Sequence, residues 1–466
     1  MRTNFILAAA LACAAICGGA ARAQSAFFDG AQDPASREVM KKAEADIEKY
    51  RKGDFVVVLV DEKGRPVKNA DAVIDLFQHQ FTFGTNMRHL SDMPESKLRS
   101  EALKAITDIF NTVIVCDYWN ENTLGKPGAF ESAKKDYRWA VDNGLRMRFH
   151  AVLYNVPGWI PTDKNLTEKD YWDIIEFRIR DVAANFRGRI PEYDVMNEMF
   201  TRKAYCDRIR EANPAFPDFS DPAVAKHIFD LARKYLPEGK LVCLEAQPAT
   251  DKNPLFLTFL DYIKALRDMG GQFDYVGNQM HFFTKGIPFQ EGHKVYGPDR
   301  FTMVGVNKGF EMLATVGKPV VITEFNGPSR SNAEPEADQN KLWTMTDKEN
   351  SAWQANFYKL AFSKPYIREL TRWYQVDNMG GRAIDGGIVD ANGDRHQIYY
   401  DLKKLIKEDW HTRVAGKTGE RGQIAMRGFY GDYDINVPGY EPATVKLYDD
   451  NKEKTVKVVL TAAKAK

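Results

Sequence analysis

The sequence predicts an α/β protein: a closed (β/α)₈ TIM barrel with a small accessory β-sandwich formed from the N- and C-terminal segments. Three observations support this prediction. Between residues 80 and 410, short apolar runs rich in β-branched residues alternate with segments of helical periodicity, which is typical of parallel βα units. Eight such runs occur, as a barrel of this kind requires. The first run lacks the glycine-rich phosphate loop that usually follows in an open doubly wound sheet.

The candidate barrel strands are, in order, Phe81–Gly84, Thr112–Cys116, Arg146–Val152, Tyr193–Met196, Leu241–Leu244, Tyr275–Met280, Pro319–Thr323 and Thr371–Val376. The segments between them carry apolar stripes at helical spacing. One stripe is formed by Ile175, Ile179, Val182 and Phe186. Because a helix with one apolar stripe can cover the outside of a sheet, the pattern favours a ring of strands inside a ring of helices.

The two ends of the chain lack this alternation. Residues 36–51 have helical periodicity, and a strand-turn-strand pattern follows between Phe55 and Phe77. Beyond Thr412 the sequence offers four short strands, Gln423–Phe429, Tyr433–Val437, Ala443–Leu447 and Thr455–Leu460. Neither end has enough strands to bury a face alone, so we expect one β-module built from both, as a brace or as a glycan-binding appendage. Its predicted boundaries are 24–79 and 411–466, and those of the barrel are 80–410.

Residues 1–23 are predicted to form a cleavable signal peptide. A basic residue is followed by an apolar run from Phe5 to Cys17, and small residues precede a cleavage position after Ala23. The run is too short for a membrane span, which needs about 20 apolar residues. A lipoprotein signal, with Cys13 or Cys17 lipidated, is the alternative. The sequence therefore predicts a secreted or periplasmic protein with no membrane span.

Charge and cysteine content argue against several other classes of protein. The chain has 65 basic and 64 acidic side chains, and this balance argues against nucleic acid as a partner. Cys116, Cys206 and Cys243 remain after the predicted cleavage, so at most one disulfide can form. No cysteine spacing resembles a zinc ligand set. We expect a monomer with no metal and no organic cofactor.

Two glutamates stand where apolar runs stop. Glu198 follows the fourth candidate strand, and Glu324 follows the seventh. Parallel barrel strands end at one mouth, where such barrels keep their active sites, so both carboxylates are expected there on nearly opposite sides. Two carboxylates held about 5 to 5.5 Å apart are the apparatus of a retaining glycosidase. Either glutamate alone would more often be a solvated or ion-paired side chain, but the joint pattern is rare by chance.

Neighbouring residues suggest separate roles for the two carboxylates. The nucleophile should stay ionised, and His281 after the sixth strand is placed to donate a hydrogen bond to it. The acid/base should have a raised pKa. Asn197 precedes the first glutamate and is placed to bind a sugar hydroxyl next to the anomeric carbon. Taken alone, His281 and His150 would more often be core histidines, and Trp159 and Trp373 core aromatics.

The residues around both glutamates resemble glycoside hydrolase family 10, retaining (β/α)₈ enzymes best known as endo-1,4-β-xylanases. Asp194–Glu198 resembles the family's acid/base segment, which implies that role for Glu198. Ile322–Phe325 resembles its nucleophile segment, which implies that role for Glu324. The resemblance covers residues 80–408, and the flanking segments are similar to those of plant-like and divergent bacterial members.

Further segments resemble the substrate-binding motifs of this family. The resemblance implies substrate binding by Asn197, His150, Asn155, Trp159, Gln279, His281 and Trp373. It implies that His150 binds the sugar adjoining the cleavage point and that His281 orients the nucleophile.

Departures from the family pattern concern the lining of the sugar subsites. After the second strand, Cys116–Asn120 replaces the usual Glu-Asn pair and its Lys-Trp, so the lysine that grips xylan is missing. The fifth strand ends Leu244–Gln247 rather than in Asn-Asp-Tyr-Asn. Asn155 stands where a second histidine is usual, and the late tryptophan is not found near Asn378. Hydrolysis is therefore better supported than xylan as the substrate.

The sequence thus predicts a retaining glycoside hydrolase of a β-linked plant-type polysaccharide or its oligomers, with β-1,4-xylan as the first candidate substrate. Hydrolysis of another β-glycan, or exo action on oligosaccharides, is the alternative. A noncatalytic carbohydrate-binding protein on a barrel scaffold is a rival of another class, although binding alone needs no second carboxylate at a controlled separation. An aldolase-type barrel would need a strand-end lysine or a phosphate site, and neither is evident.

Overall fold

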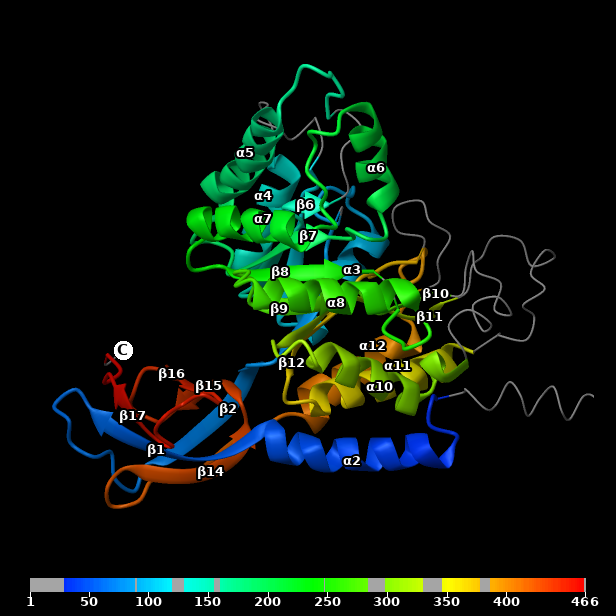
Figure 1. Ribbon diagram of the computed structural model, residues 1–466. Helices are drawn as coiled ribbons and strands as arrows, with labels where there is room; N and C mark the ends of the chain where they lie inside the picture. Colours follow the sequence, from blue (N-terminus) through cyan, green and yellow to red (C-terminus); the bar gives the residue numbers. More distant parts are fainter. Residues whose placement is uncertain are drawn as a thin grey trace, which may run out of the picture.

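The computed structural model describes residues 29–464 except 89, 120–129, 155–159, 247, 284–297, 330–345 and 378–385. Figure 1 shows a barrel surrounded by helices, with a smaller β-module made from both chain ends beside it. The predicted signal peptide lies outside the described residues. Among the residues that are described, no helix is both long and apolar enough to cross a membrane.

Eight parallel strands close the barrel. Each strand pairs with the next, and the last pairs with the first to complete the ring. In ring order they are β3 (Thr82–Asn86), β4 (Thr112–Cys116), β5 (Arg146–His150), β7 (Glu192–Asn197), β8 (Lys240–Glu245), β9 (Tyr275–Asn278), β11 (Val320–Ser329) and β12 (Ile367–Arg372). The short strands β6 (Leu153–Tyr154) and β10 (His281–Phe283) pair with β7 and β11. The predicted closed barrel is confirmed.

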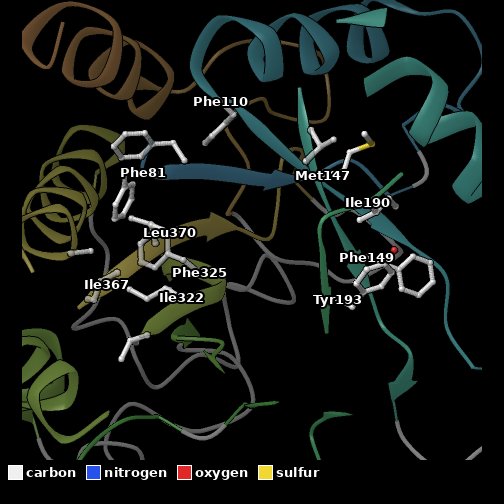
Figure 2. Close-up of a cluster of buried hydrophobic side chains, with 14 of the residues drawn as sticks. Phe81, Phe110, Met147, Phe149, Ile190, Tyr193, Ile322, Phe325, Ile367 and Leu370 are labelled. Carbon is white, nitrogen blue, oxygen red and sulfur yellow. The ribbon is translucent and has the colours of Figure 1, made fainter. Parts of the chain in front are cut away.

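Buried apolar side chains from these strands pack into the core. Figure 2 shows part of it, with Phe149 of β5, Tyr193 of β7 and Ile322 of β11 among the labelled residues. All three are fully or almost fully buried. Both faces of a parallel barrel strand are covered, so such strands form continuous apolar runs, and this is why the sequence located most of them.

The eighth strand was predicted in the wrong place. The sequence indicated Thr371–Val376, but β12 covers Ile367–Arg372. The reason is that β12 is buried yet carries charges, since Glu369 and Arg372 are both at most 1% exposed. Their charges are met by hydrogen bonds and an ion pair inside the barrel, and an apolar pattern cannot reveal a strand of this kind.

The helices form the outer layer. They are α3 (Lys97–Ile109), α4 (Glu131–Asp142), α5 (Glu168–Phe186), α6 (Lys203–Ala212), α7 (Pro222–Tyr235), α8 (Pro254–Asp268), α10 (Met303–Ala314), α11 (Asp347–Ser363) and α12 (Gln397–Lys404), with a 3₁₀ turn η1 (Pro298–Phe301) and a π turn η3 (Leu405–Asp409). Helix α5 shows why they form. The Thr167 hydroxyl and the Asp170 carboxylate cap its first turn reciprocally, and the predicted apolar stripe of α5 is buried.

The β-module consists of two sheets, and each sheet combines strands from both chain ends. One sheet has the order β14 (Gln423–Phe429), β1 (Lys52–Asp61), β17 (Thr455–Leu460), and the other β13 (Arg413–Lys417), β2 (Asp71–His79), β15 (Gly431–Asn436), β16 (Ala443–Leu447). Burial alternates along β1 and β2, so each sheet hides one face. The exposed edge strand β13 was not predicted, because it has little apolar content. The face-to-face sandwich and the domain boundaries stay predictions.

The N-terminal helix α2 (Pro34–Tyr50) packs on the barrel rather than within the β-module. It begins at the cap Asp33, whose side chain accepts from the Ser36 N–H, and runs along α10 and α11. The Ser36 hydroxyl in turn accepts from the Val304 N–H of α10 at 3.1 Å. The sequence grouped this helix with the module because a β pattern follows it, and apolar periodicity does not say which partner a helix covers.

The three described cysteines are buried free thiols. Burial raises the pKa of the Cys116, Cys206 and Cys243 thiols above the usual range. They act as small apolar side chains, and the described structure contains no disulfide among them.

A cavity of about 460 Å³ lies between the β-module and the beginning of the barrel strands. Strand-start residues line one side, among them Arg146, Glu192 and Glu369, and the module contributes Tyr448 and Asp449. The Arg146 guanidinium donates to the carbonyl oxygens of the β2–β3 connection at 2.8 to 3.3 Å. The module therefore covers the amino end of the barrel and leaves the carboxyl end open to the loops.

Candidate active site

The fold brings Glu198 and Glu324 to the carboxyl end of the barrel. Glu198 directly follows β7, and Glu324 lies within β11, three strands further around the ring. Both carboxylates are largely buried, with 9% of Glu198 and 3% of Glu324 exposed. The charge of Glu198 contributes to raising the pKa of Glu324, so the two groups share one electrostatic environment.

The backbone at this site adopts an unusual conformation. Glu198 has φ 59° and Met280 has φ 54°, in the left-handed region that residues other than glycine rarely enter. Glu198 directly follows β7, and Met280 lies in the short link between β9 and β10. Neighbouring groups hold both residues there. The Glu198 N–H donates to the Leu244 carbonyl at 3.3 Å, and the Met280 N–H donates to the Asn278 side chain at 3.1 Å. Strain of this kind concentrates at functional sites.

Both oxygens of Glu198 accept hydrogen bonds from side chains. The Arg202 Nε donates to Oε2 at 2.8 Å, and the Gln279 Nε2 donates to Oε1 at 2.9 Å. The same Gln279 nitrogen lies 3.0 Å from Asn197 Oδ1. Asn197 and Gln279, which the sequence assigned to substrate binding, thus contact each other, and Gln279 contacts Glu198.

Glu324 lies between two imidazoles. His281 Nε2 is 3.4 Å from Oε2, and His150 Nε2 is 3.7 Å from Oε1. Burial raises the pKa of Glu324 to about 8, and the nearby His150 and Arg148 oppose this rise. The sequence led us to expect an ionised nucleophile. The structure differs because the strand end is deeply buried and neither imidazole makes a short hydrogen bond to the carboxylate.

A chain of buried polar groups fixes His150. Its Nδ1 donates to Asp194 Oδ2 at 2.7 Å, which directs Nε2 toward Glu324 and toward Asn197 Nδ2 at 3.5 Å. Asp194 also lies 3.5 Å from Arg148 Nε. Arg148 is fully buried, and its Nη2 donates to the Thr323 carbonyl at 2.7 Å, just before Glu324. The orientation of the imidazole is therefore set inside the barrel.

Aromatic rings surround His150 on the mouth side. Trp373 packs edge-on against the imidazole with ring centroids 5.1 Å apart, and Tyr118 does so at 5.6 Å. Tyr154 lies 4.9 Å from the Tyr118 ring. The Arg88 guanidinium covers Tyr118 at 4.3 Å. Rings of this kind can stack on sugars, and Trp373 is partly exposed.

Glu245 anchors the loop that follows Glu198. This fully buried carboxylate ends β8, and it accepts from the Phe200 N–H at 2.8 Å and from the Thr201 hydroxyl at 2.6 Å. It stands where the family resemblance led us to expect a different motif. The departure has a structural role, because it ties the loop of Glu198 to the next strand.

Of the site residues assigned from the sequence, the structure brings seven together and leaves two undescribed. The seven are Glu198, Glu324, Asn197, His150, Gln279, His281 and Trp373. Asn155 and Trp159 lie outside the described residues. Their roles in binding and catalysis stay predictions.

Among the residues of this site to which the sequence assigned no role are Arg202, Tyr154, Asp194 and Glu245. Two of them carried a signal. Arg202 stands four residues after Glu198, the spacing of an ion pair on a helical turn. Asp194 is a charge inside an otherwise apolar strand, and such a charge must be paired when buried. Tyr154 and Glu245 contact the loop between β7 and α6, which is distant from each of them in the sequence, and the sequence alone did not indicate these contacts.

The described site residues do not form a metal centre. Within the described part of the chain, no group of three or more His, Cys, Asp and Glu side chains could hold a metal ion. The expectation of a cofactor-free protein stays a prediction.

Comparison with known proteins connects this geometry to a family. Residues 73–403 match the model of Glycosyl hydrolase family 10. Anti-sigma-I factor RsgI6 of Acetivibrio thermocellus is 25% identical over 84% of this chain and 45% of its own length. Endo-1,4-beta-xylanase 3 of Arabidopsis thaliana is 22% identical over 69% of this chain and 37% of its own. The chain thus spans less than half the length of these two curated relatives.

Solved structures share the fold. Xylanase 10B from Thermotoga maritima superimposes with a TM-score of 0.53 and 17% identity, over 73% of this chain and 96% of that structure. A GH10 structure from Paenibacillus barcinonensis gives 0.54 and 18%, over 70% of this chain and 95% of the other. At this identity the likeness establishes the barrel alone.

Proposed function

Because the chain belongs to glycosyl hydrolase family 10, we propose that it is a retaining glycoside hydrolase that cleaves a β-linked plant-type glycan. The first candidate substrate is β-1,4-xylan. One observation carries the proposal: Glu198 and Glu324 face a common site, and each is held by its own set of side chains. Other β-glycans and exo action on oligosaccharides remain alternatives.

In this proposal Glu324 is the nucleophile and Glu198 the acid/base. The Glu324 carboxylate attacks the anomeric carbon while Glu198 gives its proton to the departing glycosidic oxygen, which forms a covalent glycosyl-enzyme. Glu198 then takes a proton from water, the water oxygen attacks the same carbon, and the bond to Glu324 breaks. Two displacements restore the original anomeric configuration.

The surrounding residues suit these steps. The positive charge that develops on the sugar favours the ionised form of Glu324 during attack, which offsets the raised pKa caused by burial. His281 and His150 each lie near one oxygen of this carboxylate, at 3.4 and 3.7 Å. Gln279 donates a hydrogen bond to Glu198 and contacts Asn197. The Trp373 ring packs beside His150.

The first relative supports a second candidate function. Its name, anti-sigma-I factor, does not describe a hydrolase, and the match covers 84% of this chain. The corresponding proposal is a barrel that binds a carbohydrate without cleaving it. The presence of both carboxylates, each with its own set of partners, favours hydrolysis, since recognition needs no such pair.

We also propose secretion or export to the periplasm as a monomer, with cleavage of the signal after Ala23. The near balance of basic and acidic side chains supports the absence of nucleic-acid partners.

Hydrolysis of defined glycans tests the proposed function. The full chain is incubated with xylan, mixed-linkage glucan and mannan, and the anomeric protons of new reducing ends are followed by NMR. We expect release from xylan with the β-anomer appearing first. Initial α-anomer would overturn the retaining mechanism. Binding to a glycan without any release would favour the noncatalytic alternative.

A further inference from the structure

Arg202 occupies a position between the acid/base candidate and an aromatic ring of the mouth. It lies in the loop between β7 and α6, four residues after Glu198. Its Nε donates to Glu198 Oε2 at 2.8 Å, and its Nη2 donates to the Tyr154 hydroxyl at 3.1 Å. The guanidinium therefore holds the carboxylate with one part of its fork and the phenol with another.

The loop is fixed independently of this ion pair. The Arg202 N–H donates to the Glu198 carbonyl at 2.9 Å, and Glu245 holds the two residues before Arg202. The backbone thus positions the Arg202 guanidinium in the same place whether or not it is paired with Glu198. A preorganised cation of this kind binds an anion at little entropic cost.

Part of the guanidinium stays available. The Arg202 side chain is 32% exposed, whereas that of its partner Glu198 is 11% exposed. Within the part of the chain that the structure describes, Nη1 makes no hydrogen bond. A guanidinium has five N–H groups in a planar fork, so one edge can hold Glu198 while another accepts a second carboxylate.

We propose that Arg202 is a specificity-determining residue that binds the carboxylate of a uronic-acid substituent on the substrate through Nη1. This inference rests on the proposed function, because it places the acidic sugar next to the bond that Glu198 protonates. The general acid contacts the glycosidic oxygen, so a cation in contact with the acid lies beside the sugars at the cut. The ligand is a β-glycan with anionic side groups, and a neutral chain leaves the edge unused.

The neighbouring ion pair on helix α6 can be compared with the pair between Arg202 and Glu198. Lys203, the next residue, pairs with Asp207 at 2.7 Å, and both side chains are more than 40% exposed. That pair does not involve Glu198 and is screened by solvent. Lys203→Gln is therefore a matched control for Arg202→Gln, since each variant removes one positive charge at neighbouring positions of the chain.

The test compares one polymer in two forms. Glucuronoxylan is assayed beside the same material after chemical reduction of its uronic-acid carboxyl groups to alcohols, so the backbone and branching stay equal. The measured quantity is the ratio of kcat/KM on the native form to that on the reduced form. A ratio within one variant cancels any general loss of activity caused by the substitution.

We expect a ratio of about ten for the wild type and for Lys203→Gln, because a charge-assisted hydrogen bond contributes roughly a factor of this size. Arg202→Gln should bring the ratio close to one. Arg202→Lys keeps the charge but loses the planar fork, and its ratio should fall between these limits. For the wild type the ratio should also fall as salt is added.

Two failures are distinguishable. Release of sugar from both polymers with a wild-type ratio near one, or a ratio that Arg202→Gln leaves unchanged, would overturn the role of Arg202 and leave the hydrolase proposal intact. Absence of release from either polymer would overturn the proposed xylan hydrolysis itself, and the inference with it.

Discussion

Each end of the barrel holds a pair of glutamates, and the two pairs resemble each other in one respect. Glu198, which follows β7, and Glu324, within β11, lie at the carboxyl end of the barrel, while Glu192 and Glu369 lie toward the amino ends of β7 and β12. Burial raises the pKa of Glu324 to about 8 and that of Glu192 to about 8. A raised carboxyl pKa therefore does not by itself mark a catalytic site in this molecule.

The partners of the two pairs differ. Glu324 faces two imidazoles, and Glu198 is held by an amide and a partly exposed guanidinium. Glu192 lies beside Glu369, which pairs with the fully buried Arg148 at 3.0 Å. The β-module covers this amino end of the barrel. Donor type and access to the mouth therefore separate the two carboxylates that we propose to be catalytic from the two at the covered end.

The largest expected difference between the two ends of the barrel is in kcat after substitution of a glutamate. Glu324→Ala is expected to lower kcat by about 10⁵-fold, because it removes the nucleophile, and azide should restore part of the rate. Glu192→Gln should leave kcat within about threefold of wild type, since it lies at the covered end. Hydrolysis of an aryl β-xyloside measures both. A Glu192→Gln variant as inactive as Glu324→Ala would break the distinction between the ends.

The free energy of unfolding should depend more on Glu369, at the amino end of the barrel, than on Glu198, at the carboxyl end. Glu369→Gln leaves the Arg148 charge buried with less compensation and is expected to lower the free energy of unfolding by about 3 kcal/mol. Glu198→Gln removes the partner of the partly exposed Arg202 and should cost less than about 1 kcal/mol.

Urea denaturation followed by tryptophan fluorescence gives both free energies. Similar losses for the two variants would show that Arg148 finds other compensation, for which Asp194 at 3.5 Å is the nearest candidate. The ion pair with Arg148 would then not be what distinguishes Glu192 and Glu369 from Glu198 and Glu324.

The same contrast explains what the sequence could predict. The barrel followed from strands such as Thr112–Cys116, whose apolar runs coincide with the observed bounds. Glu198 and Glu324 followed because a carboxylate after an apolar run stands out. These features are local in the sequence, and parallel strands bring their ends to one mouth by topology alone.

The rest depends on contacts between distant segments. The strand containing Glu369 was misplaced because its charges are satisfied by Arg148 from another strand. The pKa of Glu324 was expected to stay low, and only burial depth shows that it rises. Arg202 lies near Glu198 in sequence, but its bond to Tyr154 of β6 required the fold.

The last expected effect concerns the pH dependence of stability, and it should be alike at both ends. A carboxyl group whose pKa is 4.5 when unfolded and about 8 when folded binds its proton more tightly in the native state. The native state therefore loses stability as pH rises from about 4.5 toward 8. Glu324→Gln and Glu192→Gln remove the ionising group, so each variant should lose less stability than the wild type as pH rises over this range.

Thermal unfolding of both variants and wild type at pH 5 and pH 8.5 measures this difference, with Glu176→Gln as the control because partner side chains lower the pKa of Glu176. An equal difference at both ends, together with unequal activity, would confirm that burial sets the proton affinity while the partners decide the chemistry. A difference for Glu324→Gln alone would mean that Arg146 and Arg148 already keep Glu192 ionised. Glu192 and Glu369 would then belong to an ordinary cluster of ion pairs. A raised carboxyl pKa would in that case distinguish the carboxyl end of the barrel from the amino end.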